Sequence, residues 1–251
     1  MKIAVLIKQV PDTETKIVIN AAKNGIDSAN VKFIISPYDE FAIEEAIKLG
    51  GESTVISMGP ERCVEGIRTA LAMGIQAAVH IDTGDKWYDP FQTATVLAKV
   101  IKDGGFDLIL CGKQAIDGDM AQVPQMVAEL IGAPQVMVVE ALEIAGDKAK
   151  ITRRIGGGSK EIYETTLPLV VGCEKGLNTP RYASLPGIMK AKSKPVDKKN
   201  AEELLAGAAA RISFSNFELP PERGTCKIIA GEPAQQAAEL VKLLREEAKV
   251  I

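Results

Sequence analysis

Strand-length apolar segments alternate with helical segments along the first half of this 251-residue chain, and no other feature restricts its fold as strongly. The predicted strands are residues 2–10, 53–58, 77–81 and 107–111. The predicted helices are residues 39–49, 61–73, 90–102 and 123–131, and glycine follows the first three. Such alternation is typical of right-handed βαβ crossovers. The sequence therefore predicts an α/β fold, with a mostly parallel sheet and helices on both of its faces.

The second half of the chain has a different pattern. Further strands are predicted at 136–141, 149–154, 162–165 and 169–172, and they indicate an antiparallel extension at one edge of the sheet. Beyond Pro195 the pattern predicts a charged, alanine-rich helix at 197–210, a proline-containing connector at 218–224 and a helix at 233–249. This last part has too little apolar variety for its own core. We therefore expect a domain at 1–195 and, at 196–251, a C-terminal arm that packs against another body.

Composition and charge argue against several classes of protein. A hydrophobic content of 46% suffices for a sizeable core, whereas a net charge of −3 and an aromatic content of 4% argue against nucleic acid as a partner. The apolar stretches are too short for a membrane span, and the first residues do not resemble a signal peptide. The four cysteines are far apart and form no Cys-x-x-Cys pair. We expect a cytoplasmic, reduced protein with no metal site and no membrane insertion.

The only histidine, His80, lies in a strand-like run, and a structural role is the better interpretation of it. Nucleophilic catalysis of the Ser/His or Cys/His kind would depend on this one residue, and no nucleophile-elbow motif accompanies it. The sequence thus offers no candidate for a catalytic residue.

Three loops leave predicted strands at the edge where open parallel sheets bind ligands. They contain residues 8–10, 58–60 and 112–123. The third is the strongest candidate, because Gly112 and Gly118 permit close backbone approach and Pro124 suits the first turn of the helix that follows. The free N–H groups and the dipole of such a turn favour a phosphate. Asp117 and Asp119 in this loop either shape the turn or form a pair of functional carboxylates, and turn shaping is the preferred interpretation.

Two other glycine patterns were considered as phosphate sites. Neither a Walker A motif nor a Gly-x-Gly-x-x-Gly after the first strand is present, so ATP hydrolysis is not indicated. The run Gly156-Gly157-Gly158 joins two predicted strands and leads into no helix, which favours a β-turn.

Residues 177–194, LNTPRYASLPGIMKAKSK, are predicted to form an irregular exposed loop, because Pro180, Pro186 and Gly187 interrupt regular structure. Leu185 and Met189 are apolar residues set among arginine and lysine. Such a loop would suit weak, electrostatically steered docking on an acidic protein surface. An equally open interpretation is that Leu185 caps the core of the domain and that the lysines are only solvated.

Several motifs in this chain resemble those of one family. VLIKQVPD, ISPYDEFAIEEA, SMGPERC, IRTALAMG, GKQAIDGD and NTPRYASLPGIMKAK occur in the order expected of the beta subunit of electron-transfer flavoproteins. The likeness runs through most of the chain, and the last two motifs are highly specific.

The resemblance implies a heterodimeric electron carrier without substrate turnover of its own. Its alpha subunit would hold most of a redox-active FAD. The beta subunit would have a nucleotide-binding fold, Rossmann-like or adenine nucleotide alpha hydrolase-like, with a structural AMP. The arm would wrap the alpha subunit. Electrons would arrive from acyl-CoA dehydrogenases and leave through a quinone oxidoreductase.

The resemblance also implies which residues form each site. The phosphate of AMP would lie near Gln122 and Val123, Tyr38 would approach the flavin, and Leu185 would insert into a partner pocket from a recognition loop at 173–195. The implied cofactor-binding residues are Leu6, Ser36, Pro37, Tyr38, Asp39, Met58, Gly112, Lys113, Gln114, Asp117, Gly118, Asp119, Met120, Ala121, Gln122 and Val123. The implied partner-recognition residues are Arg181, Tyr182, Leu185, Pro186, Ile188, Met189 and Lys190.

Three departures from the family pattern leave the nucleotide of the beta subunit open. Ala121 and Val123-Pro124 replace the residues found in loops of the mitochondrial type, and Ser36 replaces the usual Asn. The Gln-Val pair is closer to bifurcating members, which bind a second FAD in place of AMP. NTPRYASLPGIMKAK favours the non-bifurcating branch and hence AMP. A stand-alone AMP-binding domain is the alternative of another class, and the coreless arm argues against it.

Overall fold

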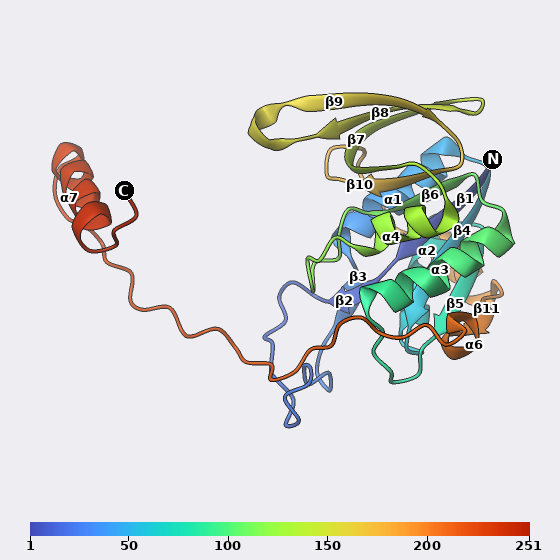
Figure 1. Ribbon diagram of the computed structural model, residues 1–251, viewed down its shortest axis with the longest axis horizontal. Helices are drawn as coiled ribbons and strands as arrows, with labels where there is room; N and C mark the ends of the chain where they lie inside the picture. Colours follow the sequence, from blue (N-terminus) through green and yellow to red (C-terminus); the bar gives the residue numbers. More distant parts are fainter. The chain divides into compact units, whose positions relative to one another are not determined.

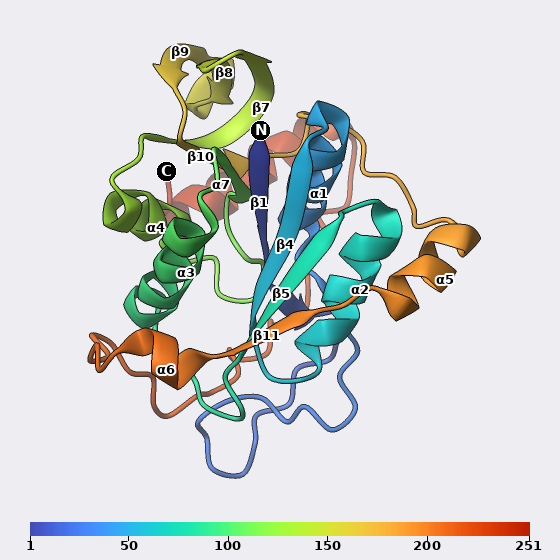
Figure 2. The ribbon, with the colours of Figure 1, turned by 90° about the vertical axis from the view of Figure 1, so that its right-hand side faces the viewer.

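A nine-stranded sheet forms the centre of the computed structural model, which describes residues 1–251 (Figures 1 and 2). Its strand order is β11-β5-β4-β1-β6-β10-β7-β8-β9. The strands are β1 (Lys2–Ile7), β4 (Glu52–Gly59), β5 (Ala77–Asp82), β6 (Leu108–Gly112), β7 (Gln135–Ala145), β8 (Lys148–Arg154), β9 (Lys160–Thr166), β10 (Leu169–Cys173) and β11 (Asp197–Asn200). All pairings from β11 to β7 are parallel, which confirms the predicted fold class.

Helices cover both faces of the sheet, and alternate residues of each central strand contact different helices (Figure 2). Ile3 and Val5 of β1 belong to the core beneath α1 (Pro37–Leu49) and α2 (Cys63–Met73). Ala4 and Leu6 belong to the core beneath α3 (Pro90–Gly104) and α4 (Val123–Ile131). Burial on two faces explains the continuous apolar sequences of β1 and β6. The central parallel position expected for residues 107–111 is confirmed, since β6 lies between β1 and β10.

The strands β7, β8 and β9 form the antiparallel extension at one edge, as predicted (Figure 1). The Gly156–Gly158 turn, a short 3₁₀ segment, joins β8 to β9 and leads into no helix, as the β-turn interpretation required. The strand β10 differs from expectation, because it lies inside the parallel part between β6 and β7. Its residues are buried on both faces, and this burial places it in the interior of the sheet.

The start of the chain adds a small second sheet. β2 (Gln9–Pro11) pairs antiparallel with β3 (Phe33–Ile35), and between them Ile19 and Ile26 form an isolated antiparallel bridge. His80 of β5 is fully buried, and its Nε2 lies 2.9 Å from the carbonyl oxygen of Gly59. A structural role for His80 agrees with this position.

The prediction of a helix at 197–210 is wrong for residues 197–200. Residues 197–200 form β11, which pairs parallel with β5, and the helix that follows is short, α6 (Ala201–Leu205). The side chain of Asn200 accepts hydrogen bonds from the N–H groups of Glu202 and Glu203, and so the helix begins there. A charged strand at the edge of a sheet has no apolar alternation by which the sequence could reveal it.

The irregular loop predicted at 177–194 is also wrong in part, since α5 (Leu185–Ser193) is a helix. Ser184 is its N-cap, and its Oγ accepts a hydrogen bond from the N–H of Gly187 at 3.1 Å. Pro186 lies in the first turn, where its missing N–H costs no hydrogen bond. Pro186 therefore marks the beginning of this helix, whereas the sequence-based prediction treated it as a break in regular structure.

By its contacts the chain divides into two units, Met1–Ser215 and Asn216–Ile251. The boundary expected after residue 195 thus falls inside the first unit, because β11 and α6 belong to the sheet and to its core. The second unit contains α7 (Pro233–Glu246), and none of the residues of this helix is buried. No helix of the chain has both the length and the apolar character needed to cross a membrane.

We predict that a chain ending at Ser215 unfolds cooperatively with nearly the Tm of the full chain, because both apolar cores lie within residues 1–215. A chain ending at Pro195 should lose about 3 kcal/mol of stability, since it lacks the β11–β5 pairing and the buried Ala201 and Leu205. Thermal and urea unfolding followed by circular dichroism measure both. Equal stability of the two shortened chains would contradict this boundary.

Candidate functional site

The loops after β1 and β6 meet at the carboxyl edge of the sheet, and one carboxylate joins them. Asp39, in the first turn of α1, accepts a hydrogen bond from the N–H of Lys8 at 2.7 Å. Its other carboxyl oxygen accepts one from the N–H of Gly112 at 2.8 Å. The side chain of Asp39 therefore links two of the loops at the edge expected to bind a ligand.

Asp39 is buried, with 6% of its surface exposed. Burial raises the pKa of its carboxyl to about 7, against the opposing effect of the hydrogen bonds from Lys8 and Gly112. A carboxylate in the first turn of a helix also interacts favourably with the helix dipole. Asp39 is thus a structural carboxylate whose charge depends on pH near neutrality.

Gly112 is required at the end of β6 by close approach. A Cβ atom at this position would lie 2.6 Å from Oδ1 of Asp39 and 2.6 Å from Cβ of Tyr38. The absence of a side chain lets the first turn of α1 pack directly on the strand end. Gly112 therefore serves packing within the protein, where the sequence indicated approach to a ligand.

The loop that follows Gly112 is stabilised by its own polar side chains. Lys8 Nζ lies 2.7 Å from the carboxylate of Asp117, and Gln114 donates a hydrogen bond of 2.7 Å to Asp119. Asp119 and Ala121 have positive φ angles of 47° and 48°, a region that non-glycine residues adopt rarely. These bonds support the turn-shaping interpretation of the two aspartates.

The loop ends at the N-terminus of α4, where Gln122 is the N-cap and Pro124 lies in the first turn. The side chain of Gln122 makes no capping hydrogen bond. Free N–H groups in a first turn, together with the helix dipole, form an anion site. This geometry agrees with a phosphate near Gln122 and Val123.

Two buried polar atoms near the same edge have no hydrogen-bond partner. They are Oγ of Ser36, a residue with no exposed surface, and Oε1 of Gln9. An unpaired buried polar group costs about 1–3 kcal/mol. Such groups mark places where a ligand can supply the missing bond.

The structure brings the predicted cofactor-binding residues to one region. Leu6 lies on β1, Met58 on β4, Ser36–Asp39 at the start of α1, and the other residues in the loop from Gly112 to Val123. The predicted partner-recognition residues lie elsewhere, in the stretch before α5 and on α5 itself. The two predicted sets therefore lie on different elements of the fold.

The recognition residues are all exposed. Tyr182 has 98% of its surface exposed and Leu185 has 79%, and Ile188 and Met189 are exposed as well. Leu185 therefore does not cap the core, and its role in docking stays a prediction.

Sequence reasoning missed Glu174, which directly follows β10 and is 2% exposed. Its carboxylate lies 2.5 Å from Lys113 Nζ and 3.4 Å from Arg154. Burial tends to raise the pKa of Glu174, but these cations outweigh it and hold the pKa below the usual value. With Tyr38, these groups line a depression of about 530 Å³. The rule that polar residues after parallel strands form ligand sites, applied to β10, would have found Glu174.

We predict that Asp39→Asn changes how stability depends on pH. Between 3.8 and about 7 the folded protein keeps a proton on Asp39 that the unfolded chain has lost, so this group makes stability fall as pH rises through that window. Asparagine cannot ionise, and the variant should lose this component of the slope in urea unfolding between pH 5 and 8. Asp103→Asn, on exposed surface of α3, should keep it. Identical slopes for Asp39→Asn and the unaltered chain would contradict the prediction.

Comparisons with known proteins agree with this arrangement. A family model described as electron transfer flavoprotein domain matches residues 24–204. The electron transfer flavoprotein subunit beta of Bacillus subtilis (strain 168) is 46% identical over 260 residues, with 100% of both chains covered. The subunit of that name from Syntrophomonas wolfei is 39% identical, covering 100% of this chain and 98% of its own, and that of Mus musculus is 37% identical, covering 100% and 99%. The chain therefore belongs to the family of electron transfer flavoprotein beta subunits.

Proposed function

We propose that this chain is the beta subunit of a one-flavin electron carrier and holds AMP as a structural group. The alpha subunit that the family implies would hold most of the FAD. Electrons would come from acyl-CoA dehydrogenase-type flavoenzymes and pass to a quinone oxidoreductase. We place the carrier in the cytoplasm, because its four free cysteines suit a reducing compartment.

The observation that carries this proposal is the separation of two sites on one unit. A nucleotide edge is built around Asp39, and an exposed apolar surface surrounds Leu185. An electron carrier needs a place for its cofactor and a different place for its donor, because transfer between flavins depends on proximity and orientation. A nucleotide-sensing domain would not need the second site.

Residues of this chain fit AMP in three respects. The first turn of α4 would receive the phosphate, Ser36 Oγ and Gln9 Oε1 lack partners that a nucleoside can provide, and Lys8 holds the loop through Asp117. AMP supplies no redox chemistry, and its part would be to stabilise the edge. The flavin supplies the electron chemistry when bound, and Tyr38 would face it. Lys113 lies beside Tyr38, with its Nζ 4.7 Å from the centroid of the Tyr38 ring.

The second unit would pack on the alpha subunit. Its helix α7 has no buried residue, and Leu240 and Val241 are exposed on it. A helix of this length without a packed apolar face is marginal in water. We therefore propose residues 216–251 as the arm, shorter than the 196–251 expected from the sequence.

A bifurcating flavoprotein with a second FAD in the beta subunit is the second candidate. The observation in its favour is the loop end, where Gln122 and Val123 lead into α4 and Ala121 adopts a positive φ angle. NADH-dependent reduction of ferredoxin, coupled to a higher-potential acceptor, is the activity that would distinguish it.

We predict that the chain purified with its alpha subunit releases FAD and AMP in equal amounts when it is denatured. Chromatography with absorbance detection measures both nucleotides. Two FAD molecules and no AMP would reject the AMP assignment in favour of the second candidate. A stable monomer that binds AMP and never copurifies with a flavoprotein would reject the carrier itself.

Ser36→Ala serves as a matched variant in that experiment. It removes a buried hydroxyl without a partner, so the nucleotide-free chain should gain about 1 kcal/mol of stability. If Ser36 bonds to the nucleotide, the same change should lower the AMP retained by the heterodimer. Unchanged AMP content would remove Ser36 from the proposed site.

We predict that Leu185→Ala lowers kcat/KM for reduction by a partner dehydrogenase about 30-fold, the effect of a hot-spot residue worth about 2 kcal/mol. Bound FAD and AMP should remain, because Leu185 is exposed on α5 and belongs to none of the loops proposed to hold the nucleotide. Ile162→Ala removes another exposed apolar side chain, on β9, and is the control. Equal rates for the two variants would show that Leu185 is not the anchor.

A further inference from the structure

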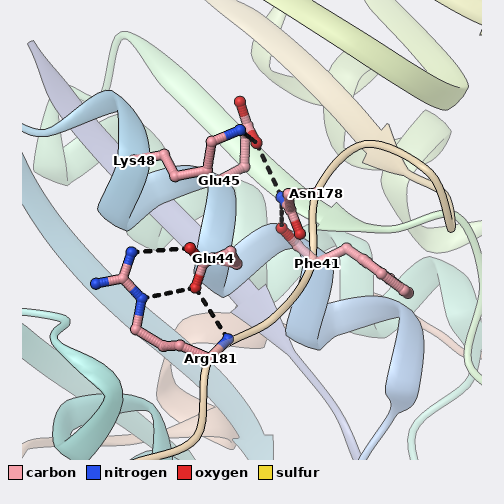
Figure 3. Close-up of polar contacts among 6 residues, drawn as sticks. All are labelled: Phe41, Glu44, Glu45, Lys48, Asn178 and Arg181. Atoms are coloured by element: carbon pink, nitrogen blue, oxygen red, sulfur yellow. Dashed lines mark hydrogen bonds and ion pairs between the residues drawn. The ribbon is translucent and has the colours of Figure 1, made fainter.

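The stretch that leads into α5, residues 177–184, is attached to the middle of α1 by a bidentate salt bridge (Figure 3). Arg181 donates from Nε to one carboxyl oxygen of Glu44 and from Nη2 to the other, both at 2.8 Å. Its backbone N–H donates a third bond to Glu44 at 3.2 Å. Glu44 is 5% exposed and the Arg181 side chain 48% exposed, so the bidentate geometry joins a buried carboxylate to a half-exposed guanidinium.

A second contact lies beside this bridge (Figure 3). The amide of Asn178 donates to the carbonyl oxygen of Phe41 at 2.9 Å and to the carboxylate of Glu45 at 2.8 Å. Glu45 is 3% exposed and also pairs with Lys48 at 3.2 Å. Backbone and side-chain groups of α1 thus hold two positions of the stretch, 178 and 181.

The other end of α5 is attached to α2. Arg68 donates to the carbonyl oxygen of Ala191 at 2.7 Å and to that of Lys194 at 2.5 Å. Carbonyl groups at the end of a helix lack intrahelical partners, and Arg68 supplies them. Lys194 in turn donates from Nζ to the carbonyl oxygen of Ile75 at 2.7 Å.

Between these ends, one face of α5 packs closely on α2. A Cβ atom at Gly187 would lie 2.3 Å from the carbonyl oxygen of Ala72, so no larger residue fits there. Ala191, one turn later, is 2% exposed. Leu185 and Met189 are therefore on the outer side of the helix, with 79% and 67% of their surfaces exposed.

These contacts matter because α5 is too short to be stable alone. It has nine residues, and isolated helices shorter than about 12–15 residues are marginal in water. A binding surface that becomes ordered only on contact binds more weakly, because part of the binding free energy is used to order it. A surface that is already ordered avoids this cost. Because Glu44 neutralises Arg181, the free positive charge near Leu185 comes from Lys190 and Lys192.

We propose that Glu44, Arg181 and Asn178 are positioning residues that hold the recognition helix in its docking conformation before the donor arrives. This inference rests on the proposed function, and it gives Arg181 a different role from direct contact with the partner. The partner is the same as in the proposed function. It would be a flavoenzyme with an apolar pocket for Leu185 and an acidic rim around the pocket for the lysines.

The test uses the complete heterodimer with FAD bound, and an acyl-CoA dehydrogenase that reduces the unaltered heterodimer. Arg181→Met removes the guanidinium group and keeps an unbranched side chain, and Arg181→Lys keeps the charge and one hydrogen bond to Glu44. Hydrogen exchange measures the order of residues 177–194. Steady-state kinetics, with the heterodimer as the varied substrate, separate KM from kcat.

Arg181→Met should speed exchange at 177–194 and raise KM about tenfold with little change in kcat, because the cost of ordering now falls on binding. Arg181→Lys should recover part of both effects. Lys190→Met, the control for lost charge, should raise KM mainly at low salt and leave exchange unchanged. FAD content should stay the same throughout.

Two results would overturn the inference. The first is unchanged exchange in Arg181→Met, whatever happens to KM, since a rise in KM alone would mean direct contact. The second is faster exchange without a rise in KM, which would mean that order at α5 is irrelevant to docking. Measuring Leu185→Ala in parallel distinguishes failure of the proposed function from failure of the positioning role. If it leaves KM and kcat unchanged, the proposed function fails, and if it alone impairs transfer, only the positioning role fails.

Discussion

The buried carboxylate of Asp39 accepts hydrogen bonds from the N–H groups of Lys8 and Gly112, and so joins the first turn of α1 to the ends of β1 and β6. The missing side chain of Gly112 allows the helix to come this close. Once these three elements are joined, the loop after β6 leads to the N-terminus of α4, and Ser36 is held in a site without exposed surface. The arrangement of the proposed nucleotide edge therefore depends on one carboxylate, which links three elements of the fold.

The helix α1 supports both proposed sites. Its first turn carries Asp39 and Tyr38 at the proposed nucleotide edge, and its middle carries Glu44 and Glu45, which hold the stretch before α5. A single rigid helix thus sets the position of the recognition surface relative to the cofactor edge. Such a support suits electron transfer, in which orientation and distance between redox groups decide the rate.

Sequence patterns predicted the parallel core well and its edges less well. The strand β6 and the helix α4 lie where periodicity placed them, because burial of a strand on two faces and of a helix on one leaves a clear pattern. β11 and α5 were not foreseen. β11 is charged and depends on pairing with β5, and α5 depends on Ser184, Arg68 and close packing at Gly187. Neither leaves a periodic signal, because partners far away in sequence stabilise both.

The sequence by itself determined the fold class and the family, since apolar periodicity, glycine positions and ordered motifs are local properties of the chain. Only the tertiary structure decided that Leu185 is exposed, that Glu174 pairs with Lys113, and that Arg181 bonds to Glu44. Each of these facts joins residues separated by dozens of positions or depends on which surface remains uncovered. Burial and long-range charge pairing arise only when the elements pack, and for this reason no local pattern records them.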